Sequence, residues 1–284
     1  MRLLPDGFFS LGIPALRQCA ASDSEWVSID EIGYLESGCP AYCEAVRELM
    51  ERKRLIAVVR KQNTPFLQEL CSREDVFLVD TDAPFGNLGC VIMASGLGKR
   101  FGGNKLLADF HGVPLIGRML DATEGIFAHR VVVTRHEDVA ALARERGIDV
   151  ILHQYPYRSD TVRLGLETMA GKVDGCAFCP GDQPLLRWET AAALALCAVH
   201  DKQAIWRTAC GETPGSPVLF PKWTFPELLR LPEGKGGSFV VKKYPGAVKN
   251  LPVRDGYELM DADSPEDLIK LLERDAVIAR RNLF

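Results

Sequence analysis

A short glycine-rich segment, residues 95–105, brings three cationic side chains close together in the chain. It follows an apolar run over 89–94 that is typical of a buried strand. Glycine has no Cβ, so its backbone N–H groups can turn inward and approach an anion closely, while nearby cations supply the balancing charge. The pattern therefore predicts a phosphate cradle at the end of a strand. Its members are Gly96, Gly98, Lys99, Arg100, Gly102, Gly103 and Lys105.

Two better-known phosphate motifs are excluded by single residues in this segment. Gly98 and Gly103 have the spacing of the P-loop of nucleoside triphosphatases, but Asn104 stands where that motif requires lysine. Phe101 occupies the position at which the dinucleotide-binding fingerprint requires a third small residue. What remains is a Gly-x-Gly-x-Arg-Phe-Gly pattern followed by Lys105. The alternative is an ordinary strand-to-helix turn with solvated basic side chains.

Acidic side chains follow two further apolar runs. Asp182 comes shortly after the run 175–179, and Asp261 and Asp263 follow the run 257–260, which we read as a strand. A carboxylate beside a polyphosphate is the usual way for a protein to hold Mg²⁺, which keeps several waters and shares oxygens with the phosphates. The alternatives are a solvated turn at Asp182 and a pair of acids that merely precede a helix. If these acids hold Mg²⁺, Asp182 and Asp263 are the candidate metal ligands.

Two other segments have the composition of anion sites. Residues 158–161 open a predicted helix, and Ser159 there is a candidate for binding the nucleotide, with plain helix capping as the alternative. Residues 234–238 combine glycine with a lysine, so Lys235 and Gly236 are candidates for binding a phosphorylated second substrate. A mobile turn would have the same composition.

Composition excludes several classes of protein. The chain has 284 residues and a net charge of −4, and this charge argues against broad nucleic-acid binding. No apolar run approaches the ~20 residues of a membrane span, and the amino terminus has no signal-peptide pattern. Nine scattered cysteines indicate reduced thiols in a cytoplasmic protein. Cys176 and Cys179 lie on one predicted strand, where residues three apart face opposite ways, so we expect no shared metal.

Apolar periodicity predicts strands and helices in alternation, which is typical of a parallel sheet with helices on its faces. We expect an α/β fold with a doubly wound, mostly parallel sheet whose ligand lies at the carboxyl ends of the strands. Composition divides the chain into a smaller segment 1–80, a turn-rich linker 81–88 and a main domain 89–284. The predicted strands are 25–31, 55–59, 76–79, 89–94, 130–134, 149–153, 175–179, 204–208, 217–220 and 257–260. The predicted helices are 39–51, 64–70, 113–126, 137–146, 160–170, 187–199 and 264–281, with Thr64 and Ser264 as amino-terminal caps.

The first segment carries an Asp-Glu pair at the end of a predicted strand. Asp30 and Glu31, within the run 30–36, resemble the Walker B element of a small family of P-loop nucleoside triphosphatases. The resemblance covers only the carboxyl-terminal half of that family, whose phosphate loop would lie upstream of Met1. We therefore expect a remnant without hydrolytic activity, or a chain that lacks its true start.

Residues 89 to about 275 resemble the MobA-like nucleotidyltransferases. The shared motifs occur in the family's order: 93–105, the metal loop 180–185, 215–220, 234–238 and 261–267. The nearest relatives by motif are molybdenum cofactor cytidylyltransferases and accessory proteins of molybdenum hydroxylases. The resemblance implies a nucleoside triphosphate over the glycine loop, pyrophosphate as the leaving group, Mg²⁺ as cofactor, a molybdopterin-type phosphorylated substrate and a molybdenum hydroxylase as a possible partner.

The resemblance also assigns roles to residues. Arg100 and Lys105 would neutralise the triphosphate, Asp182 would hold Mg²⁺, and Ala94, Ser95 and Gly96 would face the nucleoside, with Gly98 in the same loop. Guanylyl enzymes of the family tend to have two glycines where this chain has Ser95 after Ala94, which favours CTP over GTP. Two alternatives remain: a sugar-phosphate or alditol-phosphate nucleotidyltransferase, and a non-catalytic carrier of molybdenum cofactor.

Overall fold

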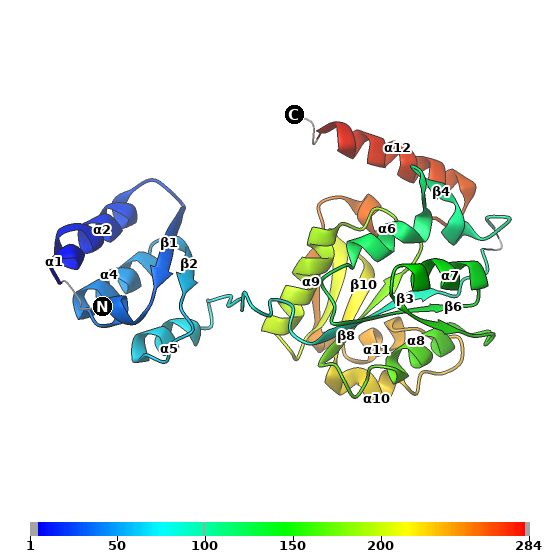
Figure 1. Ribbon diagram of the computed structural model, residues 1–284, viewed down its shortest axis with the longest axis horizontal. Coiled ribbons are helices and arrows are strands. Elements are labelled where there is room, and N and C mark those ends of the chain that lie inside the picture. Colours follow the sequence, from blue (N-terminus) through cyan, green and yellow to red (C-terminus); the bar gives the residue numbers. More distant parts are fainter. Residues whose placement is uncertain (1–4, 99, 282–284) are drawn as a thin grey trace. The chain divides into compact units, whose positions relative to one another are not determined.

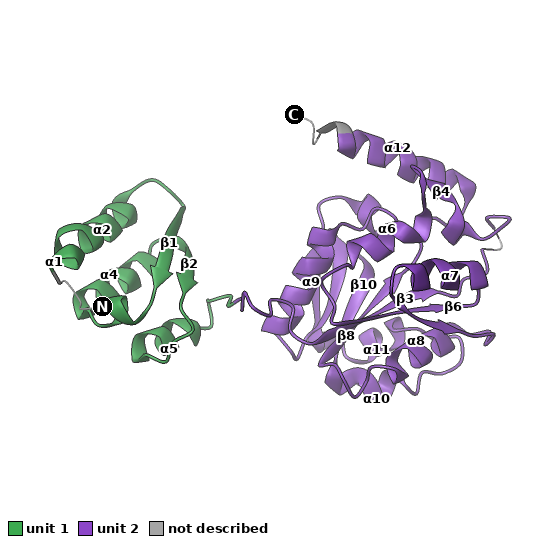
Figure 2. Ribbon diagram, in the orientation of Figure 1, with its two compact units in different colours: residues 1–78 green, residues 79–284 purple. Residues whose placement is uncertain are grey.

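The computed structural model describes residues 5–98 and 100–281. The chain divides into two compact units, one ending at Leu78 and the other beginning at Val79 (Figure 2). Each unit has a hydrophobic core of its own.

The first unit contains a parallel pair of strands covered by helices. In residues 5–78 the strands are β1 (Trp26–Ile32) and β2 (Arg54–Val59). The helices are α1 (Pro5–Gly7), α2 (Ile13–Ala21), α3 (Tyr34–Ser37), α4 (Pro40–Met50) and α5 (Pro65–Cys71), with a π-helical turn at Phe8–Gly12. The predicted cap of α5 is confirmed, because Thr64 Oγ1 accepts a hydrogen bond from the Leu67 N–H at 3.2 Å.

The predicted strand over 76–79 is wrong. These residues join no sheet, and Phe77, Leu78 and Val79 are 50%, 51% and 39% exposed. An apolar run becomes a strand only where a neighbouring strand accepts its backbone hydrogen bonds and a core covers its side chains. Among the described residues, neither condition is met for this run.

The second unit is built on a mostly parallel sheet, which confirms the predicted fold class. Within residues 79–98 and 100–281 its order is β11-β9-β10-β8-β3-β6-β7, and only β10 runs antiparallel to its neighbours (Figure 1). The strands are β3 (Leu88–Ala94), β6 (His129–Thr134), β7 (Asp149–Leu152), β8 (Gly175–Pro180), β9 (Ile205–Cys210), β10 (Thr213–Pro221) and β11 (Val248–Pro252). A separate hairpin pairs β4 (Asp109–Phe110) with β5 (Val113–Pro114).

Helices cover both faces of this sheet. One core cluster joins the sheet to α6, α7, α9 and α12, and the other joins it to α8, α10 and α11 (Figure 1). The helices are α6 (Leu115–Ala122), α7 (Glu137–Glu145), α8 (Arg158–Glu167), α9 (Trp188–His200), α10 (Phe225–Leu228), α11 (Ser238–Lys243) and α12 (Pro265–Arg281). Short 3₁₀ segments are Lys105–Leu107, Lys222–Thr224, Pro245–Ala247 and Gly256–Leu259.

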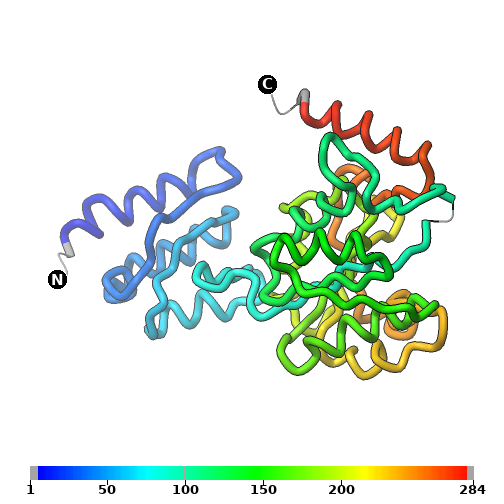
Figure 3. The backbone as a smooth tube through the Cα atoms, turned by 45° about the vertical axis from the view of Figure 1, so that its right-hand side comes forward, coloured from blue at the N-terminus to red at the C-terminus, as the bar shows by residue number. Residues whose placement is uncertain are grey.

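The last helix is fixed at its start and along its length. Ser264 Oγ accepts from the Asp267 N–H at 3.2 Å and Asp267 accepts from the Ser264 N–H at 3.1 Å, which confirms the predicted cap. Leu271 is fully buried, and Asp275 lies 3.6 Å from both His111 and Arg118. Helix α12 therefore lies beside the β4–β5 hairpin, as both views show (Figures 1 and 3).

Two predicted elements of this unit need correction. The predicted helix 113–126 is shorter, because Val113–Pro114 pairs with the preceding strand and the helix spans only Leu115–Ala122. The predicted strand 257–260 is a 3₁₀ turn over Gly256–Leu259, which Asp255 opens by accepting from the Tyr257 N–H at 3.1 Å. An acidic side chain that caps the next backbone groups favours a turn over a strand.

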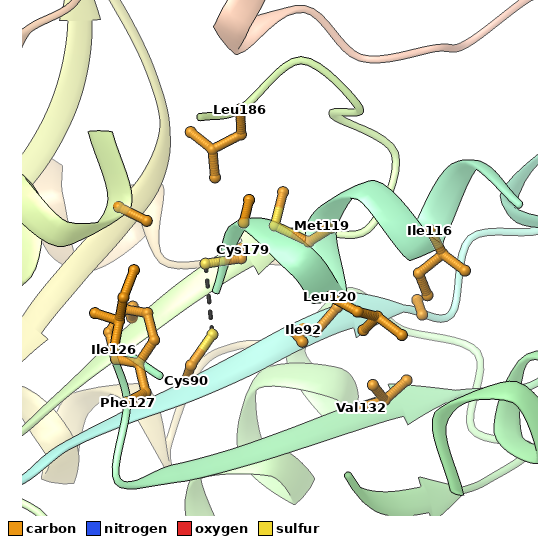
Figure 4. Packing of buried hydrophobic residues seen from close by; sticks show 14 of the residues in the cluster. Cys90, Ile92, Ile116, Met119, Leu120, Ile126, Phe127, Val132, Cys179 and Leu186 are labelled. Carbon is orange, nitrogen blue, oxygen red and sulfur yellow. Dashed lines mark hydrogen bonds between the residues drawn. The ribbon is translucent and has the colours of Figure 1, made fainter. Parts of the chain in front are cut away.

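The two cysteines of β8 face opposite sides of the sheet, as predicted. Cys179 belongs to one core cluster and Cys176 to the other, and both are fully buried. Figure 4 shows Cys179 beside Cys90, with the two sulfur atoms 3.5 Å apart. Burial raises the pKa of the Cys176 thiol well above its usual value. These thiols are packing groups.

Candidate active site

The carboxyl ends of four neighbouring parallel strands, β8, β3, β6 and β7, meet at one edge of the sheet. A cleft of about 610 Å³ lies there. Several residues singled out from the sequence line it together: Ser95, Gly96, Gly98, Arg100, Lys105, Asp182 and Asp263. Arg100 and Asp182 thus share one hollow, although they are 82 positions apart in the chain and five strands with their helices lie between them.

The loop after β3 depends on glycine at one position above all. Gly98 has φ +57°, a left-handed conformation that side chains other than glycine adopt at a cost. A Cβ on Gly98 would also lie 2.6 Å from the carbonyl oxygen of Gly103. The loop therefore folds back on itself at Gly98. Gly96, in contrast, has no described atom within 4 Å of a built Cβ and borders the cleft.

Strand β6 holds the start of this loop. Ser95 Oγ donates to the Val133 carbonyl at 3.0 Å, and Thr134 Oγ1 donates to the Ala94 carbonyl at 3.0 Å. His136 Nε2 donates to the Gly96 carbonyl at 2.9 Å. The backbone at positions 94–96 is therefore fixed by side chains from the neighbouring strand and the turn after it.

A cluster of opposite charges lies at the other side of the loop. The Lys105 ammonium is 2.5 Å from an Asp182 oxygen and 2.9 Å from an Asp263 oxygen, while Arg100 is 3.1 Å from Asp263. The Lys105 side chain is only 8% exposed. Burial opposes its charge, but the two carboxylates outweigh burial and raise the pKa of Lys105. The bond from Lys105 lowers the pKa of Asp263 despite partial burial.

The acidic segment 261–263 is tied to the loop after β8. The Ala262 N–H donates to the Asp182 carbonyl at 2.9 Å, and Gln183 Nε2 donates to Asp261 at 2.8 Å and to the Leu259 carbonyl at 3.0 Å. Burial, together with the charge of Asp182, raises the pKa of Asp261. This segment places Asp263 beside Lys105 of the glycine loop, although the two residues are 158 positions apart in the chain.

The side of the cleft over β6 and β7 contains a hydrogen-bonded pair of uncharged side chains, Ser95 and His153, in place of the ion pairs. His153 follows β7, and its Nδ1 accepts from the Tyr155 N–H at 3.1 Å, so the proton of the neutral ring lies on Nε2. That Nε2–H donates to Ser95 Oγ at 2.8 Å. Burial, with the charge of Arg135, lowers the pKa of His153. Tyr155 and Arg135 line the cleft beside this pair.

Four predicted site residues, Ala94, Ser159, Lys235 and Gly236, lie outside the cleft lining. Ala94 is buried at the end of β3, and Ser159 is 7% exposed in the first turn of α8. Lys235 is exposed on the loop before α11. Its neighbour Gly236 packs against Arg158, since a built Cβ would lie 3.2 Å from Arg158 Cδ, and Arg158 does line the cleft. The segment 234–238 therefore borders the cleft wall without entering it.

Sequence reasoning missed His136, His153 and Arg135. None belongs to a motif with metal or phosphate spacing, and the two histidines bond to residues 40 and 58 positions away in the chain. The signal that could have found them is their place at the end of a predicted strand or within two residues after it, combined with the strand order.

Two family models match the chain. A model of the MobA-like NTP transferase domain matches residues 90–248, more than half of the chain. The chain belongs to the MobA-like NTP transferase family. A second model, described as NTPase, matches residues 3–83. Both resemblances expected from the sequence are thereby confirmed, and the cleft lies in the unit that carries the nucleotidyltransferase match.

Curated relatives match shorter stretches. The bifunctional protein GlmU of Streptomyces coelicolor is 36% identical over 124 residues, which cover 40% of this chain and 26% of GlmU. A 3-deoxy-manno-octulosonate cytidylyltransferase of Neisseria meningitidis serogroup B is 34% identical over 86 residues, 29% of this chain and 34% of that enzyme. The chain thus spans between a quarter and about a third of these relatives.

Solved structures resemble the chain over about two thirds of its length. Rv0371c from Mycobacterium tuberculosis has a TM-score of 0.58 at 24% identity and covers 66% of this chain and 98% of its own. CMP:2-keto-3-deoxy-manno-octonic acid synthetase in complex with CTP has a TM-score of 0.54 at 14% identity, and the match covers 69% of this chain and 98% of the synthetase. Molybdopterin-guanine dinucleotide biosynthesis protein A from Archaeoglobus fulgidus has a TM-score of 0.53 at 19% identity, and the match covers 66% of this chain and 98% of that protein. At these identities the likeness establishes the fold.

No helix within residues 5–98 and 100–281 is both long and apolar enough to cross a membrane.

Proposed function

We propose that this protein transfers CMP from CTP to molybdopterin and releases pyrophosphate. The observation that carries the proposal is that two cationic side chains and two acidic side chains face each other in one cleft. Arg100 and Lys105 come from the glycine loop, and Asp182 and Asp263 meet them there. In a member of the MobA-like NTP transferase family, such a cleft suits a polyphosphate and the metal that accompanies it.

The reaction is an in-line displacement at phosphorus. A terminal phosphate oxygen of molybdopterin forms a bond to the α-phosphorus of CTP, the bond from that phosphorus to the β-phosphate oxygen breaks, and pyrophosphate leaves. Phosphoryl and nucleotidyl transfers of this kind need positioning and charge neutralisation rather than a covalent nucleophile. We assign Arg100 and Lys105 to the triphosphate oxygens. The backbone of the loop from Ser95 to Gly98 would border the nucleotide.

The acids fit a magnesium ion by their chemistry. Asp182 and Asp263 already face one cation, the Lys105 ammonium, at 2.5 and 2.9 Å. Carboxylate oxygens are the ligands that Mg²⁺ takes from proteins, and it takes the rest from phosphates and water. When bound there, Mg²⁺ would neutralise charge on the triphosphate. A structure of Rv0371c is a complex with manganese, which supports a divalent ion in this fold.

Two observations support CTP. Ser95 stands after Ala94, where guanylyl enzymes of the family tend to have two glycines. The curated relative from Neisseria is a cytidylyltransferase at 34% identity. The same relative supports a second candidate function, cytidylyl transfer to a sugar acid or to a sugar or alditol phosphate, because its acceptor is 3-deoxy-manno-octulosonate.

The proposal is tested by label transfer. The protein is incubated with Mg²⁺ and each α-³²P-labelled nucleoside triphosphate, with molybdopterin or with a panel of sugar acids and sugar phosphates as acceptor. We expect label from CTP on molybdopterin together with pyrophosphate. Label on a sugar acceptor alone would favour the second candidate. Cofactor binding without any label transfer would overturn the catalytic proposal in favour of a carrier.

A further inference from the structure

The strongest unexplained feature of the cleft is a donor without an acceptor. Arg135 directly follows β6 and lines the cleft. Its Nε is buried, yet it has no hydrogen-bond partner among the described residues. Leaving a buried donor of a charged group unpaired is costly, whereas an acceptor supplied by a ligand removes that cost. The cations of the glycine loop differ, because Arg100 and Lys105 already bond to Asp263.

The order of the strands in the sheet indicates which part of a bound nucleotide would lie near Arg135. The proposed triphosphate site lies over β8 and β3, where Lys105 meets Asp182. Strand β6 comes next and β7 after it, and neighbouring strands are about 4.8 Å apart. From β8 to the space over β6 and β7 is therefore about 10–14 Å. This span suits a nucleoside triphosphate extended from its phosphates to its base.

Ser95 and His153, which lie at the same side of the cleft, already have hydrogen-bond partners. Ser95 Oγ donates to the Val133 carbonyl and accepts from His153, and His153 Nδ1 accepts from the Tyr155 N–H. Tyr155 is 54% exposed, lines the cleft, and its ring lies 6.1 Å from the His153 ring at an interplanar angle of 24°. A flat aromatic ring beside the buried, unpartnered Nε of Arg135 is a suitable setting for a nucleobase.

We infer that Arg135 reads the nucleobase by donating hydrogen bonds to two adjacent acceptors on its edge. Cytosine presents O2 and N3 side by side, and guanine presents O6 and N7. Adenine and uracil place an N–H donor next to the acceptor that the guanidinium would face. Arg135 therefore selects CTP and GTP over ATP and UTP. The inference rests on the proposed nucleotide binding and adds a residue that determines base specificity.

The test measures equilibrium binding of the four nucleoside triphosphates, with Mg²⁺ and without an acceptor, to the full chain. The variants are Arg135→Gln, which removes the charge, and Arg135→Lys, which keeps the charge but loses the planar fork. Arg144→Gln is the matched control, because Arg144 is on the exposed surface of α7 and pairs with Glu137. Circular dichroism checks the fold of each variant, and Arg135→Lys carries the test if Arg135→Gln does not fold.

We expect the wild type to prefer CTP or GTP. Both Arg135 variants should bind the preferred nucleotide about tenfold or more weakly, as when a charge-assisted contact is lost, while ATP and UTP change little. Arg144→Gln should match the wild type. An equal loss for all four nucleotides, rescued by lysine, would make Arg135 a phosphate ligand and overturn the inference. Unchanged discrimination with nucleotide still bound would also overturn it. Wild-type protein that binds no nucleotide would reject the proposed function as well.

Discussion

The substitution Gly98→Ala violates two constraints on the glycine loop at once, one on the backbone conformation and one on the space for a Cβ. Gly98 has φ +57°, and a residue with a Cβ in that conformation costs about 1–2 kcal/mol. The new Cβ would also lie 2.6 Å from the Gly103 carbonyl oxygen, a backbone atom that cannot rotate away. The loop must therefore open, and a total strain of about 2 kcal/mol would weaken nucleotide binding about 30-fold.

The same loop provides matched controls. Gly102 has φ +77° but no described atom within 4 Å of a built Cβ, so Gly102→Ala has the backbone strain without the clash. Gly103 has neither a positive φ nor a neighbour within 4 Å, so Gly103→Ala should change little. Nucleotide affinity should fall in the order Gly103→Ala, Gly102→Ala, Gly98→Ala, measured by equilibrium binding with Mg²⁺. If Gly98→Ala binds as well as Gly103→Ala, the folded-back loop is not the binding conformation.

Two further predictions concern the charged and titrating groups of the cleft. Lys105→Met leaves Asp182 without this cation and leaves Asp263 paired with Arg100 alone. We expect the free energy of unfolding to fall by about 2–3 kcal/mol, less than for a fully buried pair because Asp263 keeps Arg100 and is 41% exposed. Mg²⁺ should raise the melting temperature of this variant more than that of the wild type; equal shifts would argue against a cation site between the acids. The pKa of His153 is lowered by burial and by Arg135, so its stabilising effect is present above pH 6.5 and is lost as the pH falls toward the lowered folded value. The melting temperature of the wild type should therefore drop more between pH 7 and pH 5 than that of His153→Gln, and parallel curves would contradict this reading.

Local patterns in the sequence predict the elements whose causes are local. The fully apolar run 89–94 is a central strand, and the Ser264-x-x-Asp267 spacing is a helix cap, because both depend on neighbouring residues. The segment 257–260 shows the limit of this reasoning. Its apolar residues suggest a strand, but the Asp255 side chain closes a turn there.

The site is predictable only where a motif carries it. The glycine loop and Asp182 stand out because glycines, cations and a proline-flanked acid are rare in these combinations. The Ser95–His153 bond joins residues 58 positions apart, and no local pattern contains it. Arg135 likewise acquires its place from the strand order, which pairs β3 with both β6 and β8. Strand order depends on packing across the whole unit, so these contacts need the structure.

The central claim is that one cleft holds a triphosphate between the cations of the glycine loop and the carboxylate of Asp182. Pyrophosphate release from CTP in the presence of Mg²⁺ and molybdopterin, compared between the wild type and Asp182→Ala, tests it most directly. The account predicts steady release by the wild type and a loss of about 10²-fold or more in the variant, as when a charge contact at the reacting phosphates is removed. A near-normal rate in Asp182→Ala would contradict the account.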